Sequence, residues 1–180
     1  MGFFTKKLRA SDLKHGRSDY FLPDIGEIPK DPQEAYDKAY KLIEDAGWTF
    51  KEREGLIEHG RKFTMTLRKI IWLSAGFHEK EIWQKAAILW HELIHVLQRK
   101  KWGHSLFLRR YATARGRWLI EAPAYRMSIR VYERLSGGKF HATNYVNAKL
   151  ISFRKDYWLG TIDKSQYEKE TRAIWFKERT

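Results

Sequence analysis

One stretch, His91-Glu92-Leu93-Ile94-His95, constrains this chain more than any other. It lies in a segment, residues 79–100, whose apolar side chains recur with the period of an α-helix. Residues four positions apart share one face of a helix, so the two imidazoles lie side by side and can bind one metal ion. Glu92 follows the first histidine and can reach a water on that ion. The fold therefore has to bury this helix and complete a metal site on one of its faces.

The apolar stripe of residues 79–100 is unusually broad. A helix that is apolar on so much of its surface is expected to lie at the centre of a domain. A basic last turn, Arg99-Lys100-Lys101, suits the negative end of the helix dipole, and Gly103 is expected to end the helix. The stripe consists of Ile82, Trp83, Ala86, Ala87, Leu89, Trp90, Leu93, Ile94 and Leu97.

A catalytic zinc ion needs a third protein ligand and an open position for water. One pattern that supplies it, H-E-x-x-H-x-x-G-x-x-H, is excluded here, because Gln98 takes the glycine position and Lys101 the final histidine position. The remaining common solution is an acidic residue on a downstream helix. Without such a ligand, His91 and His95 would be a pair of core histidines.

Two carboxylates on the next long helix are candidates for that ligand. Glu133 has Arg130 and Arg134 beside it, and a surface ion pair explains it. Glu121 stands against an apolar run, Trp118-Leu119-Ile120, where a carboxylate is costly unless it is paired or bound to metal. We therefore predict Glu121 as the third ligand.

The N-terminal half contains one further helix and a short β-region. Residues 1–30, punctuated by proline and glycine, are expected to form an irregular arm, and residues 31–180 a single domain. Asp31-Pro32 predicts the start of a helix over residues 32–46, with Gly47 as its C-cap. Two or three antiparallel strands are expected within residues 48–74, at Trp48-Thr49-Phe50, at Phe63–Leu67 and, as a strand or a helix edge, at Ile70–Leu73, with turns at Glu54-Gly55 and His59-Gly60.

The C-terminal half reads as helical. Residues 105–117 are expected to form a connecting helix or an ordered loop. A second long helix follows from Trp118 to the Gly137-Gly138 pair, with Glu121 at its start because Pro123 fits only a first turn comfortably. Residues 142–157 and 164–178 predict two more helices around a turn at Gly160. The expected fold class is α+β, mainly helical, with a small antiparallel sheet before the motif helix.

The charge composition indicates which classes of partner the chain could bind. The chain of 180 residues has 35 Lys and Arg against 22 Asp and Glu, a net charge of +13, which favours nucleic acid or another polyanion as a partner. A solvated basic face is the alternative explanation. Cysteine is absent, so disulfides and thiolate zinc sites are excluded. Because neither a signal peptide nor a membrane span is recognisable, we expect a cytoplasmic protein. The compact, cysteine-free composition, rich in Trp and Lys, would also suit a phage-encoded protein.

At this point the chain resembles the gluzincins, zinc metallopeptidases with H-E-x-x-H on one helix and a glutamate ligand on the next, and in particular their small, minimal-domain members. The resemblance covers roughly residues 80–130 and rests on three stretches: His91–Gln98, Phe107–Tyr111 and Glu121–Arg126. It implies a zincin-like domain in which an edge strand of the small sheet receives an extended substrate. Pro123 and Tyr125 depart from the family pattern, which often has acids at these two positions.

The expected function is that of a zinc-dependent metallopeptidase acting on a protein or peptide. Zn²⁺ would be held by His91, His95 and Glu121, and Glu92 would act as general base on the zinc-bound water. The alternative is a basic binding or assembly module whose metal site is structural or vestigial. Four side chains are candidates for stabilising the developing oxyanion: Tyr125, His141, Tyr145 and Tyr157.

Overall fold

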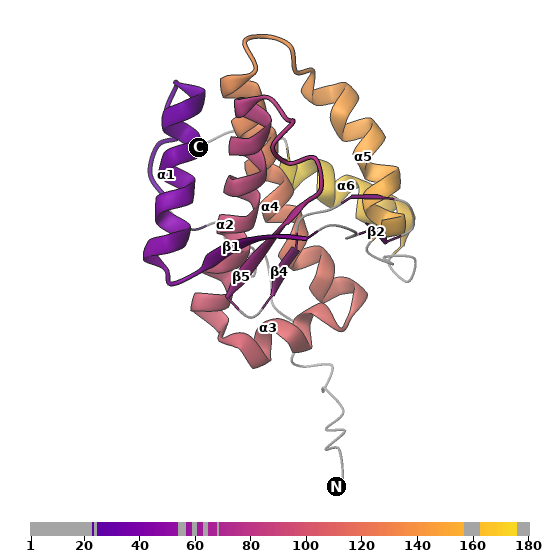
Figure 1. The fold of residues 1–180 in the computed structure, drawn as a ribbon. Coiled ribbons are helices and arrows are strands. Elements are labelled where there is room, and N and C mark those ends of the chain that lie inside the picture. The colour runs from indigo at the N-terminus through magenta and orange to yellow at the C-terminus, as the bar shows by residue number, and fades with distance from the viewer. Residues whose placement is uncertain are drawn as a thin grey trace, which may run out of the picture.

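The computed structural model describes residues 23, 25–53, 57–58, 61–62, 65–67, 69–156 and 163–175. Within them the fold is α+β with helices predominating, as the sequence predicts. Helices α2 and α4 lie side by side at the centre, α1 flanks α2, and the strands cross in front of this pair in Figure 1. The helices are α1 (Pro32–Asp45), α2 (Ile82–Trp102), α3 (His104–Tyr111), α4 (Ala114–Leu135), α5 (Ala142–Asp156) and α6 (Lys164–Trp175).

Helix α1 begins and ends where the sequence predicts. The Asp31 carboxylate accepts a hydrogen bond from the Glu34 amide at 2.9 Å, and Pro32 follows at the first helical position. Gly47, just beyond the C-cap Ala46, has a φ of 78°, a conformation that glycine adopts without strain. The buried face of α1 packs on α2, so α1 covers one side of the helix that carries the H-E-x-x-H motif.

The sheet differs from the expectation of antiparallel pairing. Strands β1 (Thr49–Arg53) and β5 (Ile70–Ser74) pair in parallel, and β4 (Met65–Leu67) adds to β5 in the antiparallel sense, giving the order β1-β5-β4. Strands β2 (Ile57–Glu58) and β3 (Arg61–Lys62) form a separate antiparallel pair. The expectation was wrong for β1 and β5 because apolar alternation identifies a strand without fixing its partner. The turns predicted at Glu54-Gly55, His59-Gly60 and Gly160 lie outside the described residues.

Helix α2 is central, as predicted. It begins at Ile82, where Glu81 is still extended, and ends at Gly103, whose φ of 73° stops the helix after its basic last turn. The Trp90 indole donates a hydrogen bond to the Ala35 carbonyl of α1 at 3.0 Å. Because Trp90 is fully buried, this bond fixes α1 on the face of α2 next to the metal-site motif.

Helix α4 corrects the predicted position of Glu121. The helix starts at Ala114, where the Thr113 hydroxyl accepts a hydrogen bond from the Gly116 amide at 3.0 Å, so Glu121 and Pro123 lie in its interior. An interior proline costs about 3 kcal/mol. The prediction failed because the Thr113 cap and the packing of α4 against α2 outweigh that cost.

Helices α3 and α4 meet at a corner that requires glycine. A Cβ atom on Gly116 would lie 1.9 Å from the carbonyl oxygen of Arg110, far inside van der Waals contact. The absence of that atom lets the end of α3 pack against the start of α4. The predicted connecting segment is therefore a helix locked in place next to the metal-site helices.

Helix α4 is shared by two apolar clusters. One joins α1, β5 and α2 to Ala124 and Met127 of α4, and the other joins Trp118 and Ile129 of α4 to α5 and α6. The predicted helices at 142–157 and 164–178 thus correspond to α5 and α6, and they pack behind α4. None of the helices in the described ranges has both the length and the apolar composition that crossing a bilayer needs.

Candidate metal centre

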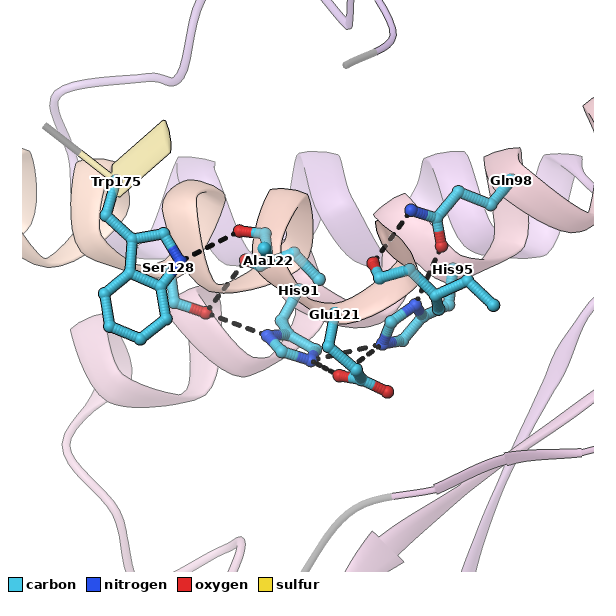
Figure 2. A network of polar contacts seen from close by, with 9 residues as sticks. His91, His95, Gln98, Glu121, Ala122, Ser128 and Trp175 are labelled. Carbon is cyan, nitrogen blue, oxygen red and sulfur yellow. Dashed lines mark hydrogen bonds and ion pairs between the residues drawn. The ribbon is translucent and has the colours of Figure 1, made fainter. Parts of the chain in front are cut away.

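Three side chains from the two central helices converge on one point. His91 and His95 of α2 bring their Nε2 atoms to 3.2 Å from each other. The Oε2 atom of Glu121, on α4, lies 3.5 Å from the first and 3.4 Å from the second. Figure 2 shows the two imidazoles and the carboxylate directed toward one another. The structure therefore brings together the three side chains that the sequence predicts as metal ligands.

The triangle of these three atoms has room for an ion at its centre. A point equidistant from atoms 3.2, 3.4 and 3.5 Å apart lies about 1.9 Å from each of them, close to the bond lengths of metal ions to imidazole and carboxylate. Oε2 of Glu121 is buried, and no donor among the described residues satisfies it. A buried carboxylate oxygen directed at two imidazole nitrogens without a hydrogen bond is what a cation site requires. This His91, His95 and Glu121 group could hold a metal ion.

The charges of the group are strongly coupled. Burial alone would lower the pKa of His95, but the Glu121 carboxylate opposes burial and raises that pKa to about 9. Burial alone would raise the pKa of Glu121, but His95 and His91 lower it to about 2. The Glu121 carboxylate and the His95 imidazole thus favour each other's charged forms, and a metal ion bound between them would take the place of the imidazole proton as the positive charge.

Each imidazole is held from its other side. Nδ1 of His95 lies 3.1 Å from Oε1 of Gln98, whose Nε2 donates to the Ile120 carbonyl at 2.9 Å. Nδ1 of His91 lies 3.2 Å from the hydroxyl of Ser128. From the sequence, Gln98 served only to exclude the three-histidine pattern, although it lies three residues after His95 and seven after His91 and so shares their helix face. Ser128 was missed altogether, although it lies seven residues after Glu121 and so shares a face of α4 with it.

Glu92 is buried, with 4% of its surface exposed. Its negative charge affects the pKa values of three neighbours. For His95, where burial and Glu121 have the larger effects, the charge of Glu92 also raises the pKa. It opposes the lowering of the Arg99 pKa by burial, and it adds to the rise in the pKa of Tyr111. The structure thus keeps Glu92 close to the ligands without making it one of the three.

Helix α3 borders the centre on the His95 side, a position that was not predicted from the sequence. The Phe107 ring meets His95 edge-on, with centroids 6.4 Å apart, and Tyr111 stacks on Phe107 at 6.3 Å. Burial raises the pKa of the Tyr111 hydroxyl, and the negative charges of Glu121 and Glu92 raise it further. The charges of the centre thus act on Tyr111, which keeps 37% of its surface exposed. The spacing of Phe107 and Tyr111, four residues apart on one helix face, was the available signal.

The predicted oxyanion candidates lie in different places. The Tyr125 ring meets His91 edge-on, with centroids 5.0 Å apart. Tyr145 packs with Tyr132 and Phe140, and His141 is exposed just before α5. Tyr157 lies outside the described residues. Of the three that lie within the described residues, Tyr125 is the one with a ring contact to a candidate ligand.

Comparison with known proteins adds no relative to this picture. The geometry of the centre has therefore to support any assignment of function by itself. No protein-family model matches the sequence, and the comparisons with curated proteins and with solved structures found no match either.

Proposed function

We propose that this chain is a zinc-dependent metallopeptidase of the gluzincin type, with His91, His95 and Glu121 as zinc ligands. The observation that supports it most is the spacing of the three ligand atoms. Ligands bound at 2.0–2.1 Å in a tetrahedral zinc site are about 3.3 Å apart. The observed separations of 3.2, 3.4 and 3.5 Å agree with that value. Three protein ligands leave the fourth position free, which is typical of catalytic rather than structural zinc.

The bound ion would supply Lewis acidity, polarising a carbonyl and lowering the pKa of a coordinated water to about 7. In our proposal Glu92 takes the proton of the attacking water and passes it to the leaving amine. Its burial beside the ligands supports this role, because general-base catalysis needs a carboxylate held at short range. Among the described residues, Tyr125 contacts His91 and Tyr111 feels the charge of both carboxylates, and both tyrosines are candidates to donate to the oxyanion.

The substrate in this proposal is an extended polypeptide. Strand β4 is at the edge of the three-stranded sheet and lies against α2. Among the described strands, only β5 pairs with β4, so its outer edge can add a substrate strand by main-chain hydrogen bonds. A peptide bound in this way would run past the helix that presents His91 and His95.

The test is the Glu92→Gln variant assayed on a library of fluorogenic peptides. Loss of the general base should lower kcat/KM by about 10²–10⁴-fold while one zinc ion per chain is retained. Glu133→Gln, which removes an exposed carboxylate on α4, is the matched control and should match wild type. Purified protein without stoichiometric metal, or a Glu92→Gln variant with wild-type activity, would contradict the proposal.

A second candidate function, binding of a polyanion, is favoured by one observation. Residues 93–120 contain seven Lys and Arg and no Asp or Glu, and Lys100, Lys101 and Arg109 are exposed. Such a surface predicts binding that weakens steeply with salt. Salt-dependent binding of oligonucleotides that is the same in Glu92→Gln, together with no proteolysis by wild type, would favour this function over the peptidase.

A further inference from the structure

We propose that the main chain of α4 around Pro123 fixes which nitrogen of each histidine is free for metal, acting through Gln98 and Ser128 as positioning residues. The proposal rests on the metal centre proposed above, but it does not require peptidase activity. Figure 2 shows Gln98 and Ser128 on the outer sides of His95 and His91.

The first relay runs from Ile120 to His95. A carbonyl oxygen can only accept, so the Ile120 carbonyl at 2.9 Å requires the NH₂ group of Gln98 to face it. The amide oxygen then faces Nδ1 of His95 at 3.1 Å, and that nitrogen has to carry the proton. When His95 is neutral, as a metal ligand has to be, Nε2 is left with its lone pair directed at the metal position. The tautomer of this ligand is thus dictated by a backbone atom on the other helix.

The second chain of hydrogen bonds runs from Ala124 to His91 and passes through the Ser128 hydroxyl. Ser128 has one proton, which it donates to the Ala124 carbonyl at 3.4 Å. Its oxygen then accepts from Nδ1 of His91 at 3.2 Å, which leaves Nε2 of His91 free for metal. Both histidines are therefore oriented by carbonyls of α4, Ile120 and Ala124, which lie on either side of Pro123.

The position of Gln98 demands an amide. The residue is fully buried, and it has to offer one acceptor to His95 and one donor to Ile120. A glutamate cannot donate to a carbonyl unless protonated, and a methionine can do neither well. The amide also joins α2 to α4, so it sets the distance between the helix of the two histidines and the helix of Glu121.

Pro123 lies among the α4 carbonyls that accept these side-chain bonds. Its ring removes the hydrogen bond to the carbonyl of Leu119 and crowds the preceding turn, and in our proposal this sets the direction of the neighbouring Ile120 carbonyl. The carbonyls of Ile120, Ala122 and Ala124 all accept side-chain donors, the second of them from the Trp175 indole at 3.1 Å. Side chains of α2, α4 and α6 thus hold three main-chain oxygens on either side of Pro123.

The experiment measures zinc affinity by competition with a chromophoric chelator, alongside the thermal midpoint of the metal-free protein. Gln98→Met should raise the zinc Kd by about 10–100-fold, and Pro123→Ala by about tenfold. Pro123→Ala should at the same time keep or raise the thermal midpoint, because the helix regains its hydrogen bond. With Co²⁺ in place of zinc, both variants should shift the visible d–d bands.

Two matched controls, Pro32→Ala at the start of α1 and the exposed Gln33→Met, should leave zinc affinity unchanged. Zinc binding by Gln98→Met or Pro123→Ala at wild-type strength overturns the proposal. A Pro123→Ala variant that loses affinity and thermal stability together also overturns it, because the proline would then act by packing. Zinc binding by wild type without proteolysis refutes only the peptidase, whereas no zinc binding by wild type refutes both.

Discussion

The two sides of the metal centre are built differently. On the His95 side (His95, Gln98 and Ile120) an amide with no exposed surface bridges two helices. On the His91 side (His91, Ser128 and Ala124) a hydroxyl returns to its own helix through a longer bond, at 3.4 Å. The exposed fractions of the two histidine side chains are 8% for His95 and 14% for His91. The His95 side thus sets the geometry, and the His91 side leaves more room for a ligand to approach.

The largest expected difference between the two sides is in stability without metal. His95→Ala takes the cation away from a buried carboxylate, which should lower the free energy of unfolding by about 3–5 kcal/mol. His91→Ala leaves Glu121 paired with His95 and should cost about 1.5 kcal/mol. Urea unfolding with a chelator present measures both, and His141→Ala, at an exposed position, should be neutral. Equal losses in the two variants would show that the sides do not differ.

The pH dependence of stability should belong to the His95 side. The pKa of His95 is raised from 6.5 to about 9, so its stabilisation is complete below 6.5 and lost as the pH rises through 9. The pKa of Glu121 is lowered from 4.5 to about 2, so its stabilisation is lost as the pH falls from 4.5 toward 2. In metal-free protein the alkaline decline should be on the order of 3 kcal/mol. Urea titrations between pH 6 and 10 measure it, and Glu121→Gln should remove it.

The smallest expected effect is on the His91 side. Ser128→Ala removes one hydroxyl contact to His91 and should raise the zinc Kd about tenfold at most, at the low end of the range for residues that support a ligand. The same chelator competition measures it, with exposed Ser105→Ala as the control. A loss greater than that of Gln98→Met would reverse the order of the two sides.

Much of the fold follows from local rules that the chain obeys. The Asp31 cap, Gly47 and Gly103 place the ends of α1 and α2 because each acts within a few residues of itself. Two predictions were wrong because the features they concern depend on tertiary packing. The parallel pairing of β1 with β5 is a long-range choice, and α4 continues through Pro123 because its packing outweighs the proline's cost.

The same division holds for the metal centre. His91, His95 and Glu121 could be predicted because ligand chemistry restricts residue type and, within α2, spacing. Gln98 and Ser128 could not, because their roles depend on main-chain carbonyls that no sequence pattern shows. The placement of Phe107 against His95, with Tyr111 stacked on Phe107, depends on the corner between α3 and α4.

That corner has a consequence for protein engineering. Since a Cβ at position 116 would collide with the Arg110 carbonyl, every other L-amino acid there forces α3 away from α4. The distance between α3, which carries Phe107, and the rest of the centre therefore cannot be adjusted by substitution at position 116. The two-residue link, Ala112-Thr113, is the place where an insertion could reposition α3, and libraries aimed at altered selectivity should vary its length.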